Sequence, residues 1–591
     1  LDRRPLENEL AWSRDVGRYL QLLRDYSDLR NEIAAVPHPE LRVDSRLLDL
    51  MPAETTVYAA APNLGEVMRE VRQLLEERLG DSEALAAWRR DGVPQLFETF
   101  SERAFDVAAD LSLHLGAEVA LGLDLATSEA QRPSGGLLLA EVVDADGLRA
   151  AIERIASGEA GLPTVSIETA RFAGFVEIED PRTSNEERQG VFLWIDEDLA
   201  AMADSVEALR RLAERRDTAQ RPFVGSSFHA TLEDLYAEGV ALIAAADLER
   251  LLPPGDEENL AFLGVDTARH LVIEQKKIDE HTQHRASVAF GEARQGVASW
   301  LAEPAPMGSL EFVAPDAKLA TAAVFRDPAL LLDDLSSIED WSMEGMRAFE
   351  ERNGLSLRDD VAATLGGEIL FALDGPLLPE PAWKLIVEVY DPARFQWALE
   401  RSIEDSNDAL RADGLAPLEL EERESGGRTL YTLSGTIEDV TLSASYTFVD
   451  GYLVAGANPA VVDQALRYRA SGYTLATSPS FLELLPVDRH NNFSAFLYQD
   501  LGSSLQPIAE RLTETMLDDE QRAQAAAIGA EMKPALVYAY GAPRRVTLAA
   551  SSQGDALSTL MMRALGMRNP AGLEAFFGLL ANVDGTPADP S

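Results

Sequence analysis

The chain contains no cysteine among its 591 residues. It therefore has no disulfide, no thiolate nucleophile and no cysteine-ligated zinc, and the absence of thiols favours a location outside the cytoplasm. Long apolar runs are absent as well, because the longest, residues 239–248, is about half of the roughly 18 to 20 residues that a membrane-spanning helix needs. The sequence thus predicts an extracytoplasmic protein, periplasmic or elsewhere in the cell envelope, without a membrane span of its own.

Lysine is scarce in this chain. It occurs only at positions 276, 277, 318, 384 and 533, so nearly all of the 52 basic residues are arginine. The 100 acidic residues outnumber the basic ones and give a formal net charge of −48. Because this charge repels nucleic acid phosphates and anionic lipids, we expect no nucleic acid as a partner. The partner that we do expect, from the repeat and the N-terminal helix described below, is a protein of an envelope assembly. The arginine bias and the acidic excess fit either a GC-rich genome or a salty environment, and both explanations stay open.

The motifs that carry common chemistries are also missing. The chain has no nucleophile elbow, Ser-x-x-Lys pair, zinc-binding His-Glu-x-x-His helix, phosphate-binding loop or dinucleotide fingerprint. Residues 224–228 resemble a nucleophile turn only in outline, and the matching residues 478–481 place proline beside the serine, which favours a helix start or a turn. We therefore expect no cofactor, and the sequence favours a binding protein over an enzyme.

Two histidines lie close together in the sequence, His281 and His284, and basic residues flank them. Two histidines without a third ligand do not define a zinc site, and the pattern around them is typical of a polar hairpin connection. They are the candidate metal ligands of the chain, although we expect no metal. The same basic patch, which includes Lys276 and Arg285, is a candidate for contact with an acidic partner or with acidic residues of the chain itself.

What the chain does contain is an internal repeat. Residues 388–401 (EVYDPARFQWALER) repeat residues 141–154 (EVVDADGLRAAIER), and residues 365–374 match residues 115–124 at Leu, Gly, Glu, Leu and Asp without a gap. Alternating apolar residues in both copies indicate half-buried strands, and the turn signals between them indicate antiparallel pairing. We interpret this pattern as an internal duplication.

Four polar residues occur at predicted helix starts in each copy, in the same order. Asp and Asn side chains at such positions accept backbone N–H bonds, each worth about 0.5 to 2 kcal/mol. We therefore interpret them as structural caps rather than as catalytic acids. They are Asn63, Asp144, Asp204 and Asp247 in the first copy and Asp327, Asp391, Asn458 and Asp500 in the second.

The predicted fold is α+β, with two tandem homologous domains whose mainly antiparallel sheets are covered by helices on one face. An N-terminal amphipathic helix over residues 6–34 precedes them. It either docks on the body or forms a stalk that leads from a removed membrane anchor. The chain starts at Leu1 rather than at methionine, which is compatible with an upstream signal peptide or anchor that was removed or left out. The expected divisions are an N-terminal helical segment (1–50), a first α+β repeat (51–250), a strand-rich connection (251–313), a second repeat (314–505), a C-terminal helix and strand segment (506–582) and a polar tail (583–591).

Matched glutamates inside the predicted strands are the remaining candidates for chemistry. Glu118 corresponds to Glu368, and Glu141 corresponds to Glu388. Exposed strand faces or ion pairs account for them in one interpretation. In the other, the four carboxylates face one interface between the copies and form a symmetric hydrolytic or metal-dependent catalytic site.

Two short stretches carry a resemblance to a known family. Residues 51–58 (MPAETTVY) with Pro62-Asn-Leu64, and residues 306–316 (PMGSLEFVAPD), resemble a family of uncharacterised bacterial envelope proteins known only as a domain of unknown function. The resemblance covers residues 51 to about 505 and brings no catalytic residues with it. It implies an exported protein, either anchored or free in the periplasm.

These patterns lead to three hypotheses of function. The first is a non-enzymatic extracytoplasmic binding or assembly (scaffold) protein with two pseudo-equivalent domains, because the structure is duplicated without a duplicated chemical motif. The second is a hydrolase or metal-dependent enzyme that uses the interface glutamates. The third is a carrier that holds an apolar ligand between the two repeats, which requires a large apolar pocket.

Overall fold

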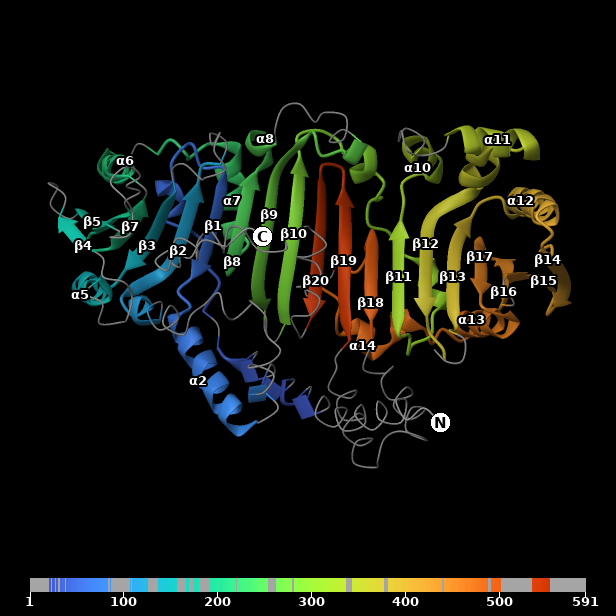
Figure 1. Cartoon of the computed structure of the whole chain (residues 1–591), viewed down its shortest axis with the longest axis horizontal. Helices are drawn as coiled ribbons and strands as arrows, with labels where there is room; N and C mark the ends of the chain where they lie inside the picture. Colours follow the sequence, from blue (N-terminus) through green and yellow to red (C-terminus); the bar gives the residue numbers. More distant parts are fainter. Residues whose placement is uncertain are drawn as a thin grey trace, which may run out of the picture.

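The described part of the chain folds into α-helices and a large antiparallel sheet (Figure 1). The prediction of a mixed α+β fold with mainly antiparallel strands is therefore confirmed. The computed structural model describes residues 21–22, 24–26, 28–29, 32–33, 35–37, 39–82, 85–86, 107, 109–125, 136–156, 166–169, 175–179, 191–203, 205–218, 221–252, 262–278, 281–335, 343–376, 381–437, 440–486, 490–500 and 534–552.

One half of the sheet comes from the first ten strands. They pair in the order β4–β5–β6–β7–β3–β2–β1–β8–β9–β10, and every pairing is antiparallel. Their bounds are β1 Val57–Pro62, β2 Leu115–Leu123, β3 Leu137–Val142, β4 Ser166–Thr169, β5 Phe175–Glu179, β6 Val191–Ile195, β7 Leu199–Ala203, β8 Leu242–Asp247, β9 Ala268–Ile278 and β10 His281–Phe290.

The other half comes from the next ten strands, which are also antiparallel throughout. They pair in the order β14–β15–β16–β17–β13–β12–β11–β18–β19–β20. Their bounds are β11 Leu319–Val324, β12 Leu365–Leu373, β13 Trp383–Val389, β14 Glu419–Ser425, β15 Arg428–Ile437, β16 Val440–Val449, β17 Tyr452–Gly456, β18 Ala495–Gln499, β19 Ala535–Ala542 and β20 Arg545–Ser552.

The two halves join edge to edge into one sheet. Strand β10 pairs antiparallel with β20, from Thr282 opposite Ser552 to Ala289 opposite Arg545. Counted outward from this junction, each strand of the first half occupies the same position as the strand numbered ten higher in the second half. The sheet therefore continues past the expected divisions at residues 250 and 505, because β9, β10, β19 and β20 belong to it as fully as the strands of the predicted repeats.

Helices cover both faces and both rims of the sheet. In Figure 1, α5 and α12 lie at opposite ends and opposite rims, and α6 and α13 do the same. This arrangement is what a two-fold axis through the β10–β20 junction would produce. The helices are α2 Gly65–Asp81, α5 Ala145–Ala156, α6 Val206–Thr218, α7 Ser227–Ala237, α8 Leu248–Leu251, α10 Pro328–Leu335, α11 Met343–Asn353, α12 Pro392–Ala412, α13 Pro459–Ser471 and α14 Pro479–Leu482, with 3₁₀ turns η1 Leu48–Leu50, η2 Gly296–Ser299, η3 Gly308–Phe312, η5 Ala362–Thr364 and η6 Leu475–Thr477 and a π-helical turn η4 Leu357–Val361.

Each half buries apolar side chains on both faces of its strands, because successive residues of a strand point to opposite sides. On one face, a cluster that includes Tyr58 and Ile243 packs under α6 and α7, and a cluster that includes Ile386 packs under η3, α13 and α14. On the opposite face, Leu148 of α5 and Phe395 of α12 each pack on a smaller cluster. Helices thus cover both faces rather than one.

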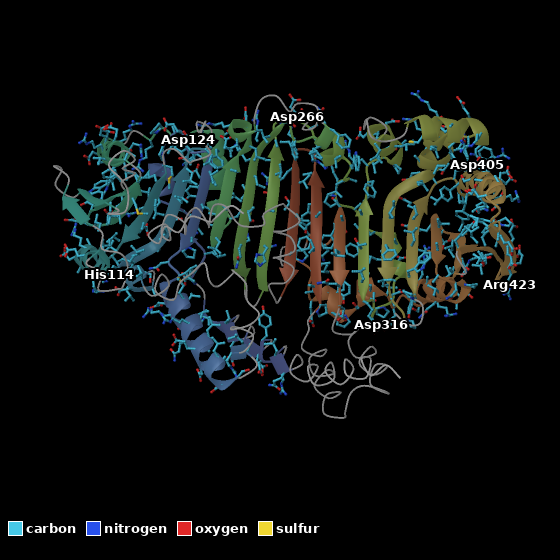
Figure 2. All side chains as sticks on the ribbon, viewed as in Figure 1. His114, Asp124, Asp266, Asp316, Asp405 and Arg423 are labelled. Carbon is cyan, nitrogen blue, oxygen red and sulfur yellow. The ribbon has the colours of Figure 1, made fainter. Side chains whose placement is uncertain are left out.

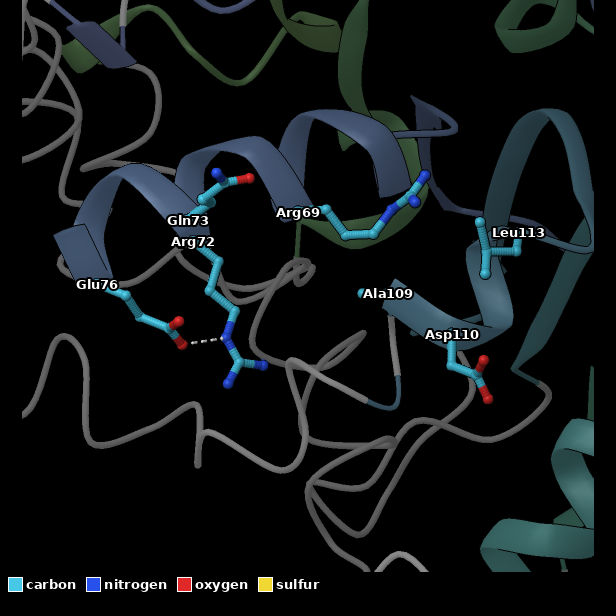
Figure 3. A pocket seen from close by; sticks show the side chains of 7 residues that line it. All are labelled: Arg69, Arg72, Gln73, Glu76, Ala109, Asp110 and Leu113. Atoms are coloured by element: carbon cyan, nitrogen blue, oxygen red, sulfur yellow. Dashed lines mark hydrogen bonds and ion pairs between the residues drawn. The ribbon is translucent and has the colours of Figure 1, made fainter.

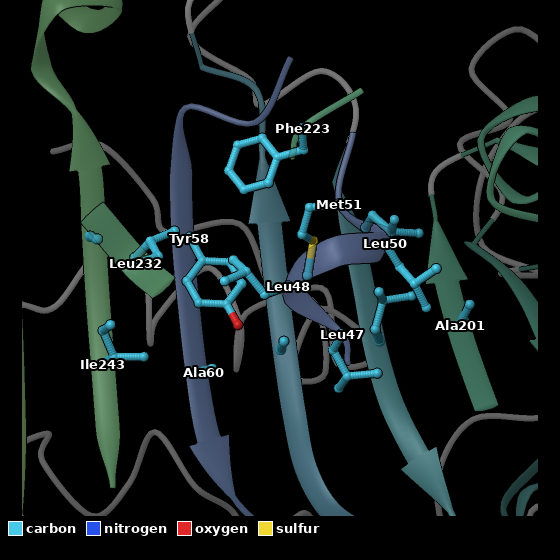
Figure 4. Close-up of a cluster of buried hydrophobic side chains, with 14 of the residues drawn as sticks. Leu47, Leu48, Leu50, Met51, Tyr58, Ala60, Ala201, Phe223, Leu232 and Ile243 are labelled. Atoms are coloured by element: carbon cyan, nitrogen blue, oxygen red, sulfur yellow. The ribbon is translucent and has the colours of Figure 1, made fainter. Parts of the chain in front are cut away.

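The segment that precedes β1 is part of the first core. Leu47, Leu48, Leu50 and Met51 are at most 7% exposed, and they lie over the strands beside Tyr58 (Figure 4). An N-terminal division at residue 50 therefore cuts through packed side chains.

The predicted N-terminal helix lies only partly within the described residues. Residues 1–20 lie outside them, whereas those described between 21 and 35 are all helical. This helix contacts α2, since Arg78 donates to Glu32 through Nε at 2.8 Å and Ser82 donates to Asp25 at 2.5 Å.

The predicted caps that the structure describes before a helix all occur at the helix start, but one of them, Asp247, makes no capping hydrogen bond. Side-chain oxygens accept backbone N–H bonds at 2.9 to 3.2 Å at five of them. Asp247 directly precedes α8, but its carboxylate makes no capping bond. Asp204 lies outside the described residues, as does the chain that follows Asp500, and Ser205 accepts the bond from Ala208 at the start of α6. The five that cap are Asn63, Asp144, Asp327, Asp391 and Asn458.

Candidate functional site

Glu118 is buried in the first half, where it fastens the segment that precedes β1. Its carboxylate is 3% exposed, pairs with the Arg42 guanidinium and accepts hydrogen bonds from the hydroxyls of Ser45 and Tyr236, both at 2.5 Å. The Tyr236 hydroxyl lies 2.9 Å from that of Tyr58. Burial raises the pKa of Glu118, and the Arg42 charge opposes that shift. The Glu118 carboxylate is therefore occupied by an ion pair and hydrogen bonds to side chains inside the first half.

Glu368 is the buried glutamate of the second half, and it binds the segment that precedes β11 through different partners. It is 5% exposed and accepts the backbone N–H groups of Gly308 at 3.2 Å and Ser309 at 2.7 Å. The hydroxyl of Tyr452 donates a third bond at 2.8 Å. Glu368 thus anchors the 3₁₀ turn η3 that precedes β11, as Glu118 anchors the segment before β1.

Glu141 and Glu388 serve the backbone at irregularities near the start of β2 and β12. The pairing register shifts after Leu115 and again after Leu365, and such bulges leave N–H groups without a ladder partner. Glu141 accepts the N–H of Ala117 at 3.1 Å, and Glu388 accepts the N–H of Glu368 at 3.4 Å.

The glycine of the repeated motif is explained by the same contact. A Cβ added to Gly116 would lie 2.7 Å from Cβ of Glu141, and one added to Gly366 would lie 2.3 Å from the carboxylate of Glu388. The glycine of the repeated Leu-Gly-x-Glu pattern is therefore explained by the close approach of a glutamate side chain.

The matched glutamates do not meet in one cleft. Strands β2 and β12 are separated by eight strands in the sheet, which places Glu118 roughly 43 Å from Glu368 at about 4.8 Å per strand. A catalytic pair needs carboxylates about 5 to 10 Å apart. Within each half, the carboxylates are occupied by the hydrogen bonds described above, so the geometry offers no symmetric acid pair.

A buried ion pair that the sequence analysis missed lies in the second half. The ammonium of Lys384, in β13, donates to Asp374 at 2.6 Å, and both side chains are 1% exposed. Lys384 also donates to the carbonyl of Phe312 at 3.3 Å and lies 5.0 Å from the ring centroid of Tyr468. Burial lowers the pKa of Lys384, and the Asp374 charge opposes that shift. The available signal was a rare lysine inside an apolar strand, residues 383–389.

The basic patch on β9 and β10 contacts acidic residues of the chain itself. Arg285 lies 3.1 Å from the buried carboxylate of Glu274 and 3.4 Å from Glu238 at the end of α7. His284 is on β10 opposite Gln275, while the side chain of His281 lies outside the described residues. Within the described ranges, no group of three His, Asp or Glu side chains is arranged to hold a metal ion.

A polar pocket of about 350 Å³ lies between α2 and residues 109–113 (Figure 3). Its charged groups have partners: Arg72 donates to Glu76 at 2.8 Å, and Asp110 accepts from Arg154 at 2.6 Å. Among the described residues, these two ion pairs engage both carboxylates of the pocket lining. Its lining is Arg69, Arg72, Gln73, Glu76, Ala109, Asp110 and Leu113.

Figure 2 shows Asp124 and Asp266 along one rim of the sheet and Asp316 along the other. No helix of the described residues is both long enough and apolar enough to cross a bilayer.

By its fold, the chain is an α+β protein organised around one large antiparallel sheet. Comparison with known proteins adds no family to this description, since no family model, no curated protein and no solved structure matches the chain. The resemblance to bacterial envelope proteins therefore stays an expectation.

Proposed function

We propose that this protein is an extracytoplasmic binding or assembly protein whose body arose by internal duplication. The strand order carries the proposal, because it is the same on the two sides of the β10–β20 junction. A body with two pseudo-equivalent halves presents two similar surfaces, which suits a scaffold better than an enzyme with one asymmetric cleft. The absence of cysteine supports a place in the periplasm or cell envelope.

The matched carboxylates support the same conclusion. Glu118 and Glu368 hold the segments that precede β1 and β11, and Glu141 and Glu388 accept N–H groups near the start of β2 and β12. The features that the two halves share are therefore architectural. The alternative enzyme, which uses glutamates at one interface, is disfavoured by their separation of roughly 43 Å at about 4.8 Å per strand.

Exposed apolar side chains at equivalent turns are the proposed contact surfaces. Val143 follows β3 and Tyr390 follows β13, and each is 70% exposed. Trp397, 42% exposed, lies in α12, which begins two residues after Tyr390. Exposed aromatic residues are enriched among those that dominate binding energy at protein interfaces.

A partner-retention assay tests the proposal. The naturally processed protein, isolated gently from the envelope fraction, is expected to retain a defined partner. The double variant Tyr390→Ala/Trp397→Ala is expected to lose most of it, because truncation of such anchors costs about 2 kcal/mol or more each. Tyr473→Ala is the matched control, since that tyrosine is 61% exposed in a turn after α13. Recovery of a free monomer, or equal retention by the double variant, would contradict the proposal.

Truncation tests the role of the N-terminus separately. Deletion of residues 1–20 removes only chain outside the described residues, so the body is expected to stay folded while association with a partner or membrane fraction weakens. Deletion of residues 1–50 also removes Leu47 and Leu48, and each buried leucine is worth about 2 to 5 kcal/mol. Thermal melting is therefore expected to show a large loss of stability in the second truncation alone.

A further inference from the structure

The first turn of α7 lies beside the end of β8 and the start of β9. Ser227 is the first residue of α7 and is exposed, whereas His270 in β9 is 5% exposed. The Ser227 hydroxyl lies 3.5 Å from Nε2 of His270, and the ring of Phe228 packs against the imidazole with centroids 5.5 Å apart. A serine open to solvent thus faces a buried imidazole whose ring is held in place.

A second hydroxyl lies on the other side of that imidazole. Thr231 donates its single hydroxyl proton to the carbonyl of Ser227 at 3.1 Å, and its oxygen lies 3.0 Å from Nδ1 of His270. With the Thr231 proton on the Ser227 carbonyl, Nδ1–H of His270 is the donor in that contact. The lone pair of Nε2 then faces Ser227. This is the orientation that a general base needs in order to take the proton of a serine.

A buried carboxylate completes the cluster. Asp247 sits opposite His270 across the β8–β9 pair and is 8% exposed. It makes no capping bond to α8, and no hydrogen bond to its carboxylate is found among the described residues. Directly opposed residues on one face of a sheet have Cβ atoms about 4.5 to 5.5 Å apart. Among the described residues the Asp247 carboxylate makes no ion pair with His270, so its charge acts on the ring through space. An aspartate without a structural bond therefore stabilises positive charge on His270.

We propose that Ser227 is the nucleophile, and His270 the general base, of an acyl-transfer site that accepts carboxylic esters. Thr231 and Asp247 are positioning residues, which fix the tautomer and stabilise the imidazolium. This inference goes beyond the scaffold proposed above, because the site occurs once and uses none of the duplicated glutamates.

The chemical step balances within these residues. The Ser227 oxygen attacks the ester carbonyl carbon while its proton passes to Nε2 of His270. The carbonyl oxygen gains negative charge beside the backbone N–H groups of Ser227 and Phe228, which have no acceptor inside the helix. The leaving alkoxide takes the proton from His270, and an acyl-serine remains. Water, deprotonated by the same imidazole, then releases the carboxylic acid and restores Ser227.

The second half retains only part of this cluster. Ser480 and Asp500 occupy the corresponding places in sequence, but Pro534 stands opposite Asp500, next to the Gln499–Ala535 pair. Ser480 instead accepts from the hydroxyl of Tyr498 at 3.3 Å. Without an imidazole, this serine has no base. It is therefore an internal control for Ser227.

Labelling of the full-length protein with an alkyl fluorophosphonate tests the proposal. Attack by Ser227 forms a P–O bond and expels fluoride, so peptide mass mapping is expected to find one adduct, on Ser227. Ser227→Ala is expected to abolish labelling, and Ser480→Ala to leave it unchanged. His270→Gln is expected to slow labelling at least about 100-fold, the lower end of what a general base contributes.

Two further readouts keep the test decisive if the His270 variant fails to fold. Burial lowers the pKa of His270, and the charge of Arg269 lowers it further. The charges of Asp247 and Glu249 oppose this shift. Labelling of the native protein is therefore expected to stay constant down to about pH 6.5, the ordinary value for histidine, and to fall below it. A burst of one 4-nitrophenol per chain from 4-nitrophenyl acetate is expected as well.

Absence of an adduct on Ser227, or equal labelling of Ser227 and Ser480, would overturn the inference. Partner retention by Ser227→Ala is expected to equal that of the native protein. Failure of the reactive serine is thereby distinguished from failure of the scaffold proposal.

Discussion

Removal of the buried Lys384 ammonium is expected to destabilise the second half severely. Lys384→Met keeps the length of the side chain but leaves Asp374 charged, 1% exposed and bonded only to the N–H of Ala314 at 2.7 Å. At 2.6 Å and an effective dielectric constant near 20, the attraction between the two charges is about 6 kcal/mol. Desolvation of both ions offsets most of that attraction, but a single buried charge has no such compensation. The expected loss is about 3 to 5 kcal/mol.

A second variant separates the charge effect from the packing effect. Asp374→Asn in the Lys384→Met background removes the stranded charge while keeping an acceptor for Ala314. The double variant is therefore expected to recover at least about half of the loss, as uncharged replacements of buried ion pairs often do. Lys318→Met is the control, because Lys318 is half-buried and donates only to the carbonyl of Asp316. Its cost is expected to stay within about 0.5 kcal/mol.

Urea unfolding monitored by tryptophan fluorescence measures these differences, since Trp383 adjoins Lys384 and reports on the same strand. A loss of less than about 1 kcal/mol for Lys384→Met would refute the argument, because a stranded buried carboxylate costs several times more. Equal destabilisation by the single and double variants would also refute it, since packing rather than charge would then account for the loss.

Three further predictions concern a helix cap, the acid stability of one aspartate and the effect of salt on melting. Asp391→Ala removes the cap of α12 and should cost about 1 kcal/mol in urea unfolding, with partner retention unchanged; lost retention at unchanged stability would instead mark a functional acid. A hydrogen bond from the Ser356 N–H, and to a smaller extent the Arg394 guanidinium, lower the pKa of Asp360 below its ordinary value of 3.8. Its contribution is therefore present above that value and lost as the pH falls through the lower folded pKa, and acid titrations of Asp360→Asn should lack this component. Raising the salt concentration from low values to about 0.5 M should raise the melting temperature, because salt screens repulsion within a chain of net charge −48; unchanged melting would mean that the carboxylates are already neutralised.

Local signals in the sequence were enough to predict the helix starts. Asp391 and Asn458, each followed by proline, bind a backbone N–H three residues ahead, so the whole interaction lies within one turn. Alternation predicted the strands for the same reason, because burial on one face of a strand has a period of two residues. Asp247 shows where this reasoning stops. Its position before a helix suggested a cap, yet its carboxylate accepts no hydrogen bond from the first turn of α8.

The candidate site could not be predicted in the same way, because its members are far apart in the chain. Glu118 and Arg42 are 76 residues apart, and Ser227 and His270 are 43 residues apart. No spacing rule connects such residues, since the pairings of β2 with β1 and of β8 with β9 decide which side chains meet.

The sequence by itself determined the mixed α+β fold, the antiparallel strands and the acidic surface, all of which follow from composition and short-range periodicity. Only the tertiary structure decided that β10 and β20 join the two halves into one sheet, and that the matched glutamates lie in separate networks rather than in one cleft. The physical reason is that strand pairing satisfies backbone groups whatever side chains they carry, so the choice of partner strand leaves little trace in the sequence.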